Sequence, residues 1–214
     1  MQTATPVARK ATRPRADALR NRERIVTAAR EMFVEFGPDV PLDEIARRAG
    51  VGNATVYRNF PDRDALVREV VCSVMDRTVA VAELALAETG DAFEALERFV
   101  HAAADERISA LCPMVQSTFD KNHPDLEAAR ERVEQLVGEI MGRAKAAGQL
   151  RPDVDVGDVM LGVAQLSRPP AGTGCDIADR FVHRYLQLFL DGLRAPARSV
   201  LPGTAMTMED LRQT

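Results

Sequence analysis

The sequence has little of the side-chain chemistry on which disulfide-rich proteins and zinc proteins depend. Its 214 residues include no tryptophan, two tyrosines, three histidines and three cysteines. The cysteines, Cys72, Cys112 and Cys175, are odd in number, far apart and without CxxC spacing. This pattern excludes a disulfide framework and the usual zinc-ligand spacing. We interpret the three cysteines as buried, reduced thiols, with redox sensing as the alternative interpretation.

The three histidines also lack a functional pattern. His101, His123 and His183 show no HExxH or HxH spacing and lie outside any nucleophile motif such as GxSxG. Isolated histidines on helices are usually solvated or satisfied by neighbours. The sequence therefore predicts no catalytic residue, no metal site and no cofactor, and the protein is expected not to be an enzyme.

Long apolar runs are missing as well. No stretch of about 18 uncharged apolar residues occurs, and the N-terminus lacks the apolar segment of a secretory signal. We therefore expect no membrane contact and a cytoplasmic location. The hydrophobic content of 46% is still sufficient to fill a real core, so a globular protein is expected.

Charge is distributed unevenly along the chain. The net charge is −4, but residues 1–30 carry eight basic side chains against Asp17 and Glu23, whereas residues 71–214 carry 15 basic against 22 acidic side chains. A basic end joined to an acidic body orients a molecule on a polyanion and keeps the body away from it. This asymmetry favours nucleic acid as a partner of the N-terminal part.

The stretch from Leu42 to Phe60 divides into two short helical patterns. Leu42, Ile45, Ala46 and Ala49 share one face, and Gly50 follows where a left-handed residue ends a helix. From Asn53 a second helix is predicted, with Val56 and Phe60 facing inward. Two short helices joined by a glycine turn form a helix-turn-helix whose second helix fits the major groove of DNA. A solvated helical hairpin is the alternative interpretation of this pattern alone.

This stretch resembles the N-terminal DNA-binding domain of the TetR family of transcriptional regulators. The resemblance covers about residues 20–70 and rests on Phe33, Phe36-Gly37, Ile45-Ala46, Ala49-Gly50-Val51, Thr55-Val56-Tyr57, Phe60 and Ala65-Leu66. Three positions depart from the commonest family pattern: Pro41 replaces a capping threonine, Gly52 a capping serine, and Arg63 a lysine. Proline suits a first helical position, glycine is tolerated as an N-cap, and arginine keeps the charge.

Six side chains are predicted to contact DNA. They are expected to project from the second helix or from the start of the next one: Asn53, Thr55, Tyr57, Arg58, Asn59 and Arg63. Arg58 suits phosphate or guanine, the asparagines suit adenine or phosphate, and the hydroxyls suit phosphate oxygens. Base discrimination is expected mainly from Asn53 and Arg58, and a phosphate contact from Arg63.

The predicted fold is all-α, with a three-helix, homeodomain-like helix-turn-helix domain followed by a larger helical domain for ligand binding and dimerisation. The predicted parts are a disordered basic tail (1–16), the DNA-binding domain (17–62), the regulatory domain (63–194) and a disordered tail (195–214). The first helix is expected over Leu19–Phe36, and a long helix from Arg63 towards Ala87 should link the domains. Later helices are predicted from Asp91, as its cap, to Leu111, from Pro113, from Pro124 to Ala147, and over Val156–Leu166 and Asp176–Leu193. The last two are predicted to form a homodimer contact like that of the family.

The resemblance implies a repressor that a small apolar or amphipathic effector releases from a palindromic double-stranded DNA operator. The expected pocket wall consists of flexible or aromatic side chains and one amide: Met75, Phe99, Leu111, Met114, Gln116, Phe119, Met141 and Met160. For each of them, ordinary close-packed core is the competing interpretation. The alternative function is an all-helical small-molecule carrier or enzyme with a structural N-terminal head.

Overall fold

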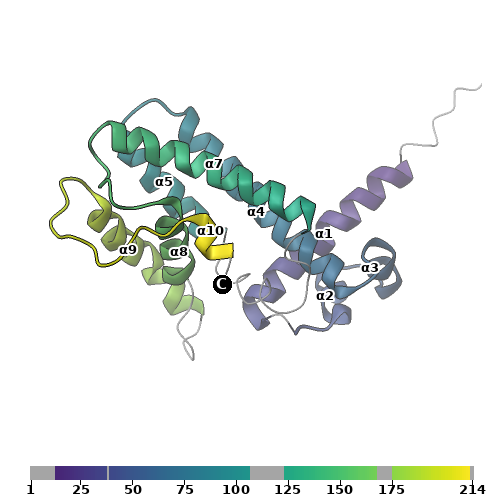
Figure 1. Cartoon of the computed structure of the whole chain (residues 1–214). Helices are drawn as coiled ribbons and strands as arrows, with labels where there is room; N and C mark the ends of the chain where they lie inside the picture. Colours follow the sequence, from purple (N-terminus) through teal and green to yellow (C-terminus); the bar gives the residue numbers. More distant parts are fainter. Residues whose placement is uncertain (1–12, 38, 107–122, 168–174, 213–214) are drawn as a thin grey trace, which may run out of the picture. The chain divides into compact units, whose positions relative to one another are not determined.

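The computed structural model describes residues 13–37, 39–106, 123–167 and 175–212 (Figure 1). Every regular element in these ranges is a helix, and Leu150 and Arg194 form an isolated β-bridge. The predicted all-α class is therefore confirmed. The chain divides into two compact units, Met1–Val70 and Val71–Thr214. We predicted the domain boundary at the start of α4, whereas the two units divide within that helix.

The first unit contains α1 (Arg13–Phe36), α2 (Leu42–Ala49), α3 (Asn53–Asn59) and the first turns of α4 (Arg63–Ala87). α1 packs against both α2 and α3. The core of this unit is formed by apolar residues at helical spacing: Ile25, Ala29, Met32, Phe33, Ile45, Val56, Phe60 and Leu66. Phe36, in the last turn of α1, is exposed.

The first helix begins earlier than predicted. α1 starts at Arg13 rather than near Leu19, since proline is tolerated in the first turn of a helix, and Pro14 lies there. The end of the predicted tail, 1–16, is therefore helical, and residues 1–12 lie outside the described structure.

The second unit contains the rest of α4 and five further described helices: α5 (Ala92–Asp105), α7 (Pro124–Ala146), α8 (Val156–Leu166), α9 (Cys175–Leu193) and α10 (Met208–Arg212). α5 packs against α7, α8 and α9, and their apolar faces share one core. Asp91 caps α5 as predicted, because its Oδ1 accepts from the Phe93 and Glu94 amides at 2.9 Å. The hydrogen bonds from Glu94, Gln149 and Phe93 lower the pKa of Asp91. α5 ends at Asp105, and the predicted helix opening at Pro113 falls outside the described residues.

The prediction of a disordered C-terminal tail is wrong for residues 195–212. The Arg151 guanidinium holds this segment by donating to the Ser199 carbonyl at 2.8 Å, and the Met206 amide donates to Asp158 Oδ1 at 3.1 Å. Thr207 and Asp210 cap α10 reciprocally, and Met208 packs against the core. Proline and glycine content suggested disorder, but these contacts are tertiary and leave no local sequence signal. We call residues 195–212 the C-terminal strap.

The C-terminal strap packs so closely on α8 that the residue at position 157 must be glycine. A Cβ atom at Gly157 in α8 would lie 2.4 Å from the Met206 carbonyl oxygen, and a backbone atom cannot rotate away. Gly157→Ala should therefore lower the free energy of unfolding by about 1–3 kcal/mol, as overpacking does. Urea denaturation provides the measurement. Gly142→Ala on α7 is the control, because no atom lies within 4 Å of its Cβ and alanine there should raise stability by about 0.5–1 kcal/mol. Equal changes in both variants would contradict the docking of the strap.

Among the described residues, no helix combines the length and apolar character that a membrane crossing requires.

Candidate nucleic-acid interface

The turn between α2 and α3 positions the candidate recognition helix. Gly50 has φ +65°, a left-handed conformation that glycine adopts without strain, and the Val51 amide donates back to the Ala46 carbonyl at 3.0 Å. Pro41 is the N-cap of α2 and not its first helical residue, and Gly52 is the N-cap of α3. Neither supplies a side-chain hydrogen bond to its helix. The two helices thus form the predicted helix-turn-helix.

The outward face of α3 consists of Asn53, Ala54, Tyr57 and Arg58, which are all exposed. Thr55 and Asn59 are half-buried at its edges, and Val56 is fully buried beneath it. The structure therefore brings together five of the six predicted contact residues. Ala54 was not predicted, although it lies on the same face. A small apolar side chain at such a position can contact a thymine methyl group.

Most of these side chains are held by bonds within the helix-turn-helix. The Asn53 amide nitrogen donates to Asp43 of α2 at 2.8 Å, and the Asn59 amide nitrogen donates to the Thr55 carbonyl at 2.7 Å. Arg58 folds along its own helix, donating to the Ala54 carbonyl at 3.0 Å and to the Thr55 hydroxyl at 3.2 Å. These acceptors of Arg58 are uncharged. A phosphate or guanine offers a stronger charge-assisted bond, so Arg58 can leave them when DNA binds.

Arg63, which we predicted to contact phosphate, binds groups of its own domain instead. Its Nη1 donates to the Val40 carbonyl at 2.7 Å, its guanidinium lies 5.7 Å from the centre of the Phe33 ring, and its Nη2 is buried without a hydrogen-bond partner. The side chain thus turns into the domain and ties the start of α4 to α1 and to Val40, two residues before α2. Sequence spacing could not reveal this, because it fixes the position of the Cα atom and not the direction of a long side chain.

Arg22 of α1 was not predicted, yet it positions the end of α3. Its guanidinium makes two hydrogen bonds to Glu69 of α4, at 3.0 and 2.8 Å, and donates to the Asn59 carbonyl at 3.1 Å. It also stacks 4.5 Å from the centre of the Phe60 ring. Arg22 therefore fastens α1, α3 and α4 together at the C-terminal end of the candidate recognition helix.

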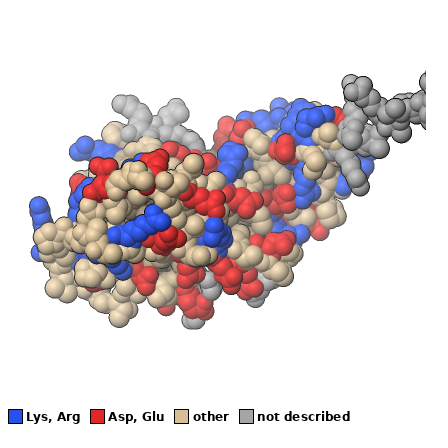
Figure 2. All heavy atoms as spheres, turned by 90° about the horizontal axis from the view of Figure 1, so that it is seen from above, with Lys and Arg blue, Asp and Glu red and all other residues tan. Residues whose placement is uncertain are grey.

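Figure 2 shows a group of basic side chains on the first unit with acidic side chains around it, and both kinds are also interspersed on the second unit. Several of these arginines are paired with carboxylates, including Arg48 with Glu31 and Glu35. Arg58 is the basic residue of α3, and its hydrogen bonds in the described structure all go to neutral groups. This makes Arg58 the cation best placed for a charged partner at the recognition helix.

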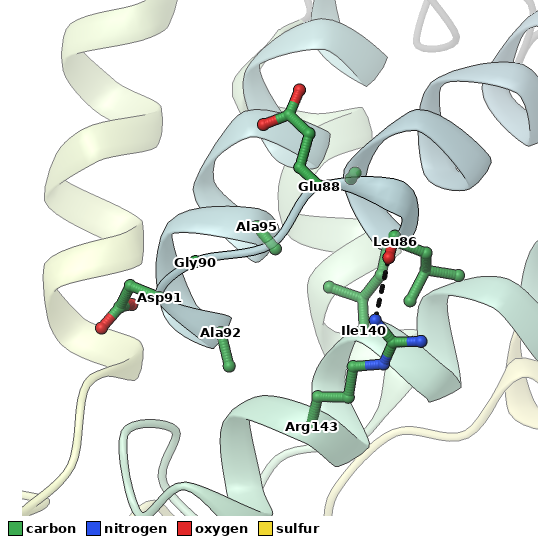
Figure 3. Close-up of a pocket in the computed structure, with 9 residues that line it drawn as sticks. Leu86, Glu88, Gly90, Asp91, Ala92, Ala95, Ile140 and Arg143 are labelled. Atoms are coloured by element: carbon green, nitrogen blue, oxygen red, sulfur yellow. Dashed lines mark hydrogen bonds between the residues drawn. The ribbon is translucent and has the colours of Figure 1, made fainter.

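The predicted ligand wall is only partly described. Phe99 and Met141 are buried in the core of the second unit, Met160 packs against that core, and Met75 is half-buried. Leu111, Met114, Gln116 and Phe119 lie outside the described residues. A small depression of about 60 Å³ occurs where α4 ends and α5 begins, and Arg143 donates to the Leu86 carbonyl at its edge (Figure 3). None of the four described wall residues lines this depression.

Two family models match the chain. The model of bacterial regulatory proteins of the tetR family covers residues 25–70, and that of the C-terminal domain of SbtR-like transcriptional regulators covers residues 91–195. The first match contains α2, α3 and the turn between them, and the second begins at the Asp91 cap of α5.

Several known transcriptional regulators are similar to this chain. A TetR transcriptional regulator from Streptomyces coelicolor is 30% identical, with a TM-score of 0.60 over 82% of this chain and 99% of that one. The transcriptional repressor LfrR of Mycolicibacterium smegmatis is 31% identical over 129 residues, 58% of this chain and 65% of that protein. The solved structure of LfrR in complex with proflavine has a TM-score of 0.65, 23% identity, and coverage of 86% and 99%. An HTH-type transcriptional regulator of Mycobacterium bovis is 41% identical over 83 residues, so the match spans only 42% of that relative's length.

Proposed function

Because the chain belongs to the TetR family of transcriptional regulators, and is therefore a DNA-binding regulator and not an enzyme, we propose that it is a dimeric repressor. It binds a palindromic operator and leaves it when a small apolar or amphipathic effector occupies the second unit. The observation that carries this proposal is the outward face of α3, where Tyr57 and Arg58 stand exposed on a helix fixed by Gly50 at one end and Arg22 at the other.

The DNA contact proposed here centres on α3. Arg58 and Asn53 read base edges in the major groove, Ala54 contacts a methyl group, and the Thr55 and Tyr57 hydroxyls hold phosphates. Asn59 contributes mainly by its bond to Thr55, which stiffens the end of the helix. Arg63 supports the domain from inside and is not part of the proposed contact.

The proposed dimer forms through α9 together with α8. Phe181, Tyr185 and Leu188 lie four and three residues apart on α9 and are 41, 52 and 59% exposed, whereas Leu186 and Leu190 of the same helix are fully buried. An apolar stripe opposite the buried face of a helix is typical of a second packing surface. A two-fold axis there gives the two recognition helices that a palindrome requires.

The proposed effector site is the interior of the second unit. Support comes from the flexible methionines Met141 and Met160, which share the core of the second unit with Phe99, and from the half-buried Met75, since such side chains adapt to ligands of varied shape. An effector releases DNA only to the extent that it binds the DNA-free form more tightly. Proflavine is a suitable first probe because the similar LfrR binds it.

Binding of a fluorescent operator duplex tests this function. Fluorescence anisotropy of DNA flanking the protein's own gene should show saturable binding by full-length protein, reversed by an effector that also raises the melting temperature. A panel containing proflavine and hydrophobic metabolites should yield at least one such compound. If compounds stabilise the protein but leave operator affinity unchanged, the proposed coupling is wrong.

A further inference from the structure

A ladder of polar side chains runs along the contact between α5 and α9. On each helix the members are four residues apart and thus share one face. The α5 members are Glu97, His101 and Asp105, and the α9 members are His183, Gln187 and Asp191. This ladder is separate from α3 and from the exposed stripe of α9, and the function proposed above makes no use of it.

The two histidines meet at the middle of the ladder. His101 Nδ1 lies 2.9 Å from His183 Nδ1, and the ring centres are 5.1 Å apart. On the far side of each ring, His183 Nε2 lies 3.0 Å from Asp105 Oδ1, and His101 Nε2 lies 3.3 Å from Gln187 Oε1. Each imidazole therefore has one nitrogen facing an oxygen and one facing the other imidazole.

The positions of the imidazole hydrogens follow from the Asp105 and Gln187 oxygens that face the two rings. The Gln187 amide nitrogen donates to Glu97 at 3.2 Å and to Asp191 at 3.1 Å, so its carbonyl oxygen is the atom that faces His101. Carbonyl and carboxylate oxygens accept, so both rings must donate through Nε2. A neutral imidazole has one N–H, which leaves Nδ1 of both neutral rings without hydrogen. Two Nδ1 acceptors then face each other across 2.9 Å, a separation that becomes favourable when a proton or a metal ion is shared between them.

We propose that His101 and His183 form a binding site for a divalent transition-metal ion of the kind that prefers imidazole, with Ni²⁺ and Cu²⁺ favoured over Zn²⁺. Metal-bound histidines usually donate their other N–H to a carboxylate or another oxygen, as both rings do here. At metal–nitrogen distances near 2.05 Å, nitrogens separated as these are subtend roughly 90° at the ion, an angle that suits square or octahedral coordination.

The surroundings suit a cation. The carboxylates of Glu97, Asp105 and Asp191 line the ladder, while one arginine, Arg194, pairs with Glu97 at 2.9 Å. The His183 and Asp105 side chains are exposed, which leaves the ion a path from solvent. No group of three or more histidine, cysteine or acidic side chains in the described part of the chain could hold a metal. Water therefore completes the coordination, and the affinity is that of a two-ligand site.

The test is calorimetric titration of NiCl₂ into untagged, full-length protein treated with a chelator and dialysed. One saturable Ni²⁺ per chain is expected, together with a higher melting temperature, because the ion cross-links α5 to α9. His101→Ala and His183→Ala should each weaken binding by at least about tenfold and abolish the thermal shift. Asp105→Asn should weaken it about tenfold through the lost partner of His183.

The third histidine of the chain provides a matched control. His123 caps α7 by accepting from the Asp125 amide, and asparagine can take over that cap, so His123→Asn should bind Ni²⁺ like the unchanged protein. Ni²⁺ binding that persists in a His101→Ala, His183→Ala double variant would place the ion at other side chains and overturn the proposal. The proposal would also be overturned if the unchanged protein showed no saturable Ni²⁺ binding. In that case the NMR resonances of the two histidines would shift with pH but not with added Ni²⁺.

Discussion

Leu188→Asp is expected to convert the proposed dimer into monomers and to weaken operator binding by about 100-fold or more. The leucine is 59% exposed on α9, so aspartate costs the folded monomer little, but in a dimer it would bury a charge without a partner. Two linked recognition helices gain about 10²–10⁴ in avidity over one, and a monomer loses this gain. Sedimentation velocity and anisotropy on the same duplex provide the two measurements.

Leu84→Asp is the matched control for this change. Leu84 lies on α4 in the same unit and is 66% exposed, so the chemical change and the starting exposure are closely similar. This variant should remain dimeric and keep its operator affinity. Circular dichroism should be native for both variants. A Leu188→Asp variant that sediments as an intact dimer would exclude this face of α9 as the interface.

Arg58→Ala should weaken operator binding by about 10- to 100-fold and reduce discrimination against random DNA, because a base contact typically accounts for 1–3 kcal/mol. Its bonds to the Ala54 carbonyl and the Thr55 hydroxyl are exposed, so thermal stability should change little. Anisotropy with operator and scrambled duplexes over a series of salt concentrations separates the base contact from the charge.

Two arginines serve as comparisons for Arg58. Arg63→Ala should produce the opposite result, a lower melting temperature with an unchanged salt dependence, because its guanidinium binds the Val40 carbonyl inside the domain. Arg132→Ala removes the same charge from an exposed pair with Glu83 in the second unit, and it should change neither stability nor binding appreciably. Equal losses of operator affinity in all three variants would mean that net charge, and not position on α3, controls binding.

The sequence was sufficient for features that depend on neighbouring residues. Apolar spacing and Gly50 predicted α2, the turn and α3, and an aspartate before an apolar run predicted the Asp91 cap. These features are local because a helix is defined by contacts three or four residues apart. The same reasoning placed Tyr57 and Arg58 on the outer face of α3.

Features that depend on distant pairs could not be predicted. Arg22 meets Glu69 47 positions later in the sequence, and His101 meets His183 82 positions later. Each residue appears isolated in the sequence, and for the histidines this led to the interpretation of side chains that are solvated or satisfied by neighbours, without naming the neighbour. The order of the C-terminal strap likewise depends on Asp158, which already caps α8 by accepting from the Asp155 amide.

The most direct test of the central claim is the affinity of the full-length protein for DNA flanking its own gene, measured by anisotropy beside a scrambled duplex at the same physiological salt concentration. We predict one palindromic site that binds two chains, with an affinity at least about 10³-fold above that for scrambled DNA. Equal affinity for the two duplexes, or no binding to either at low salt, would contradict the assignment of this protein as a site-specific repressor.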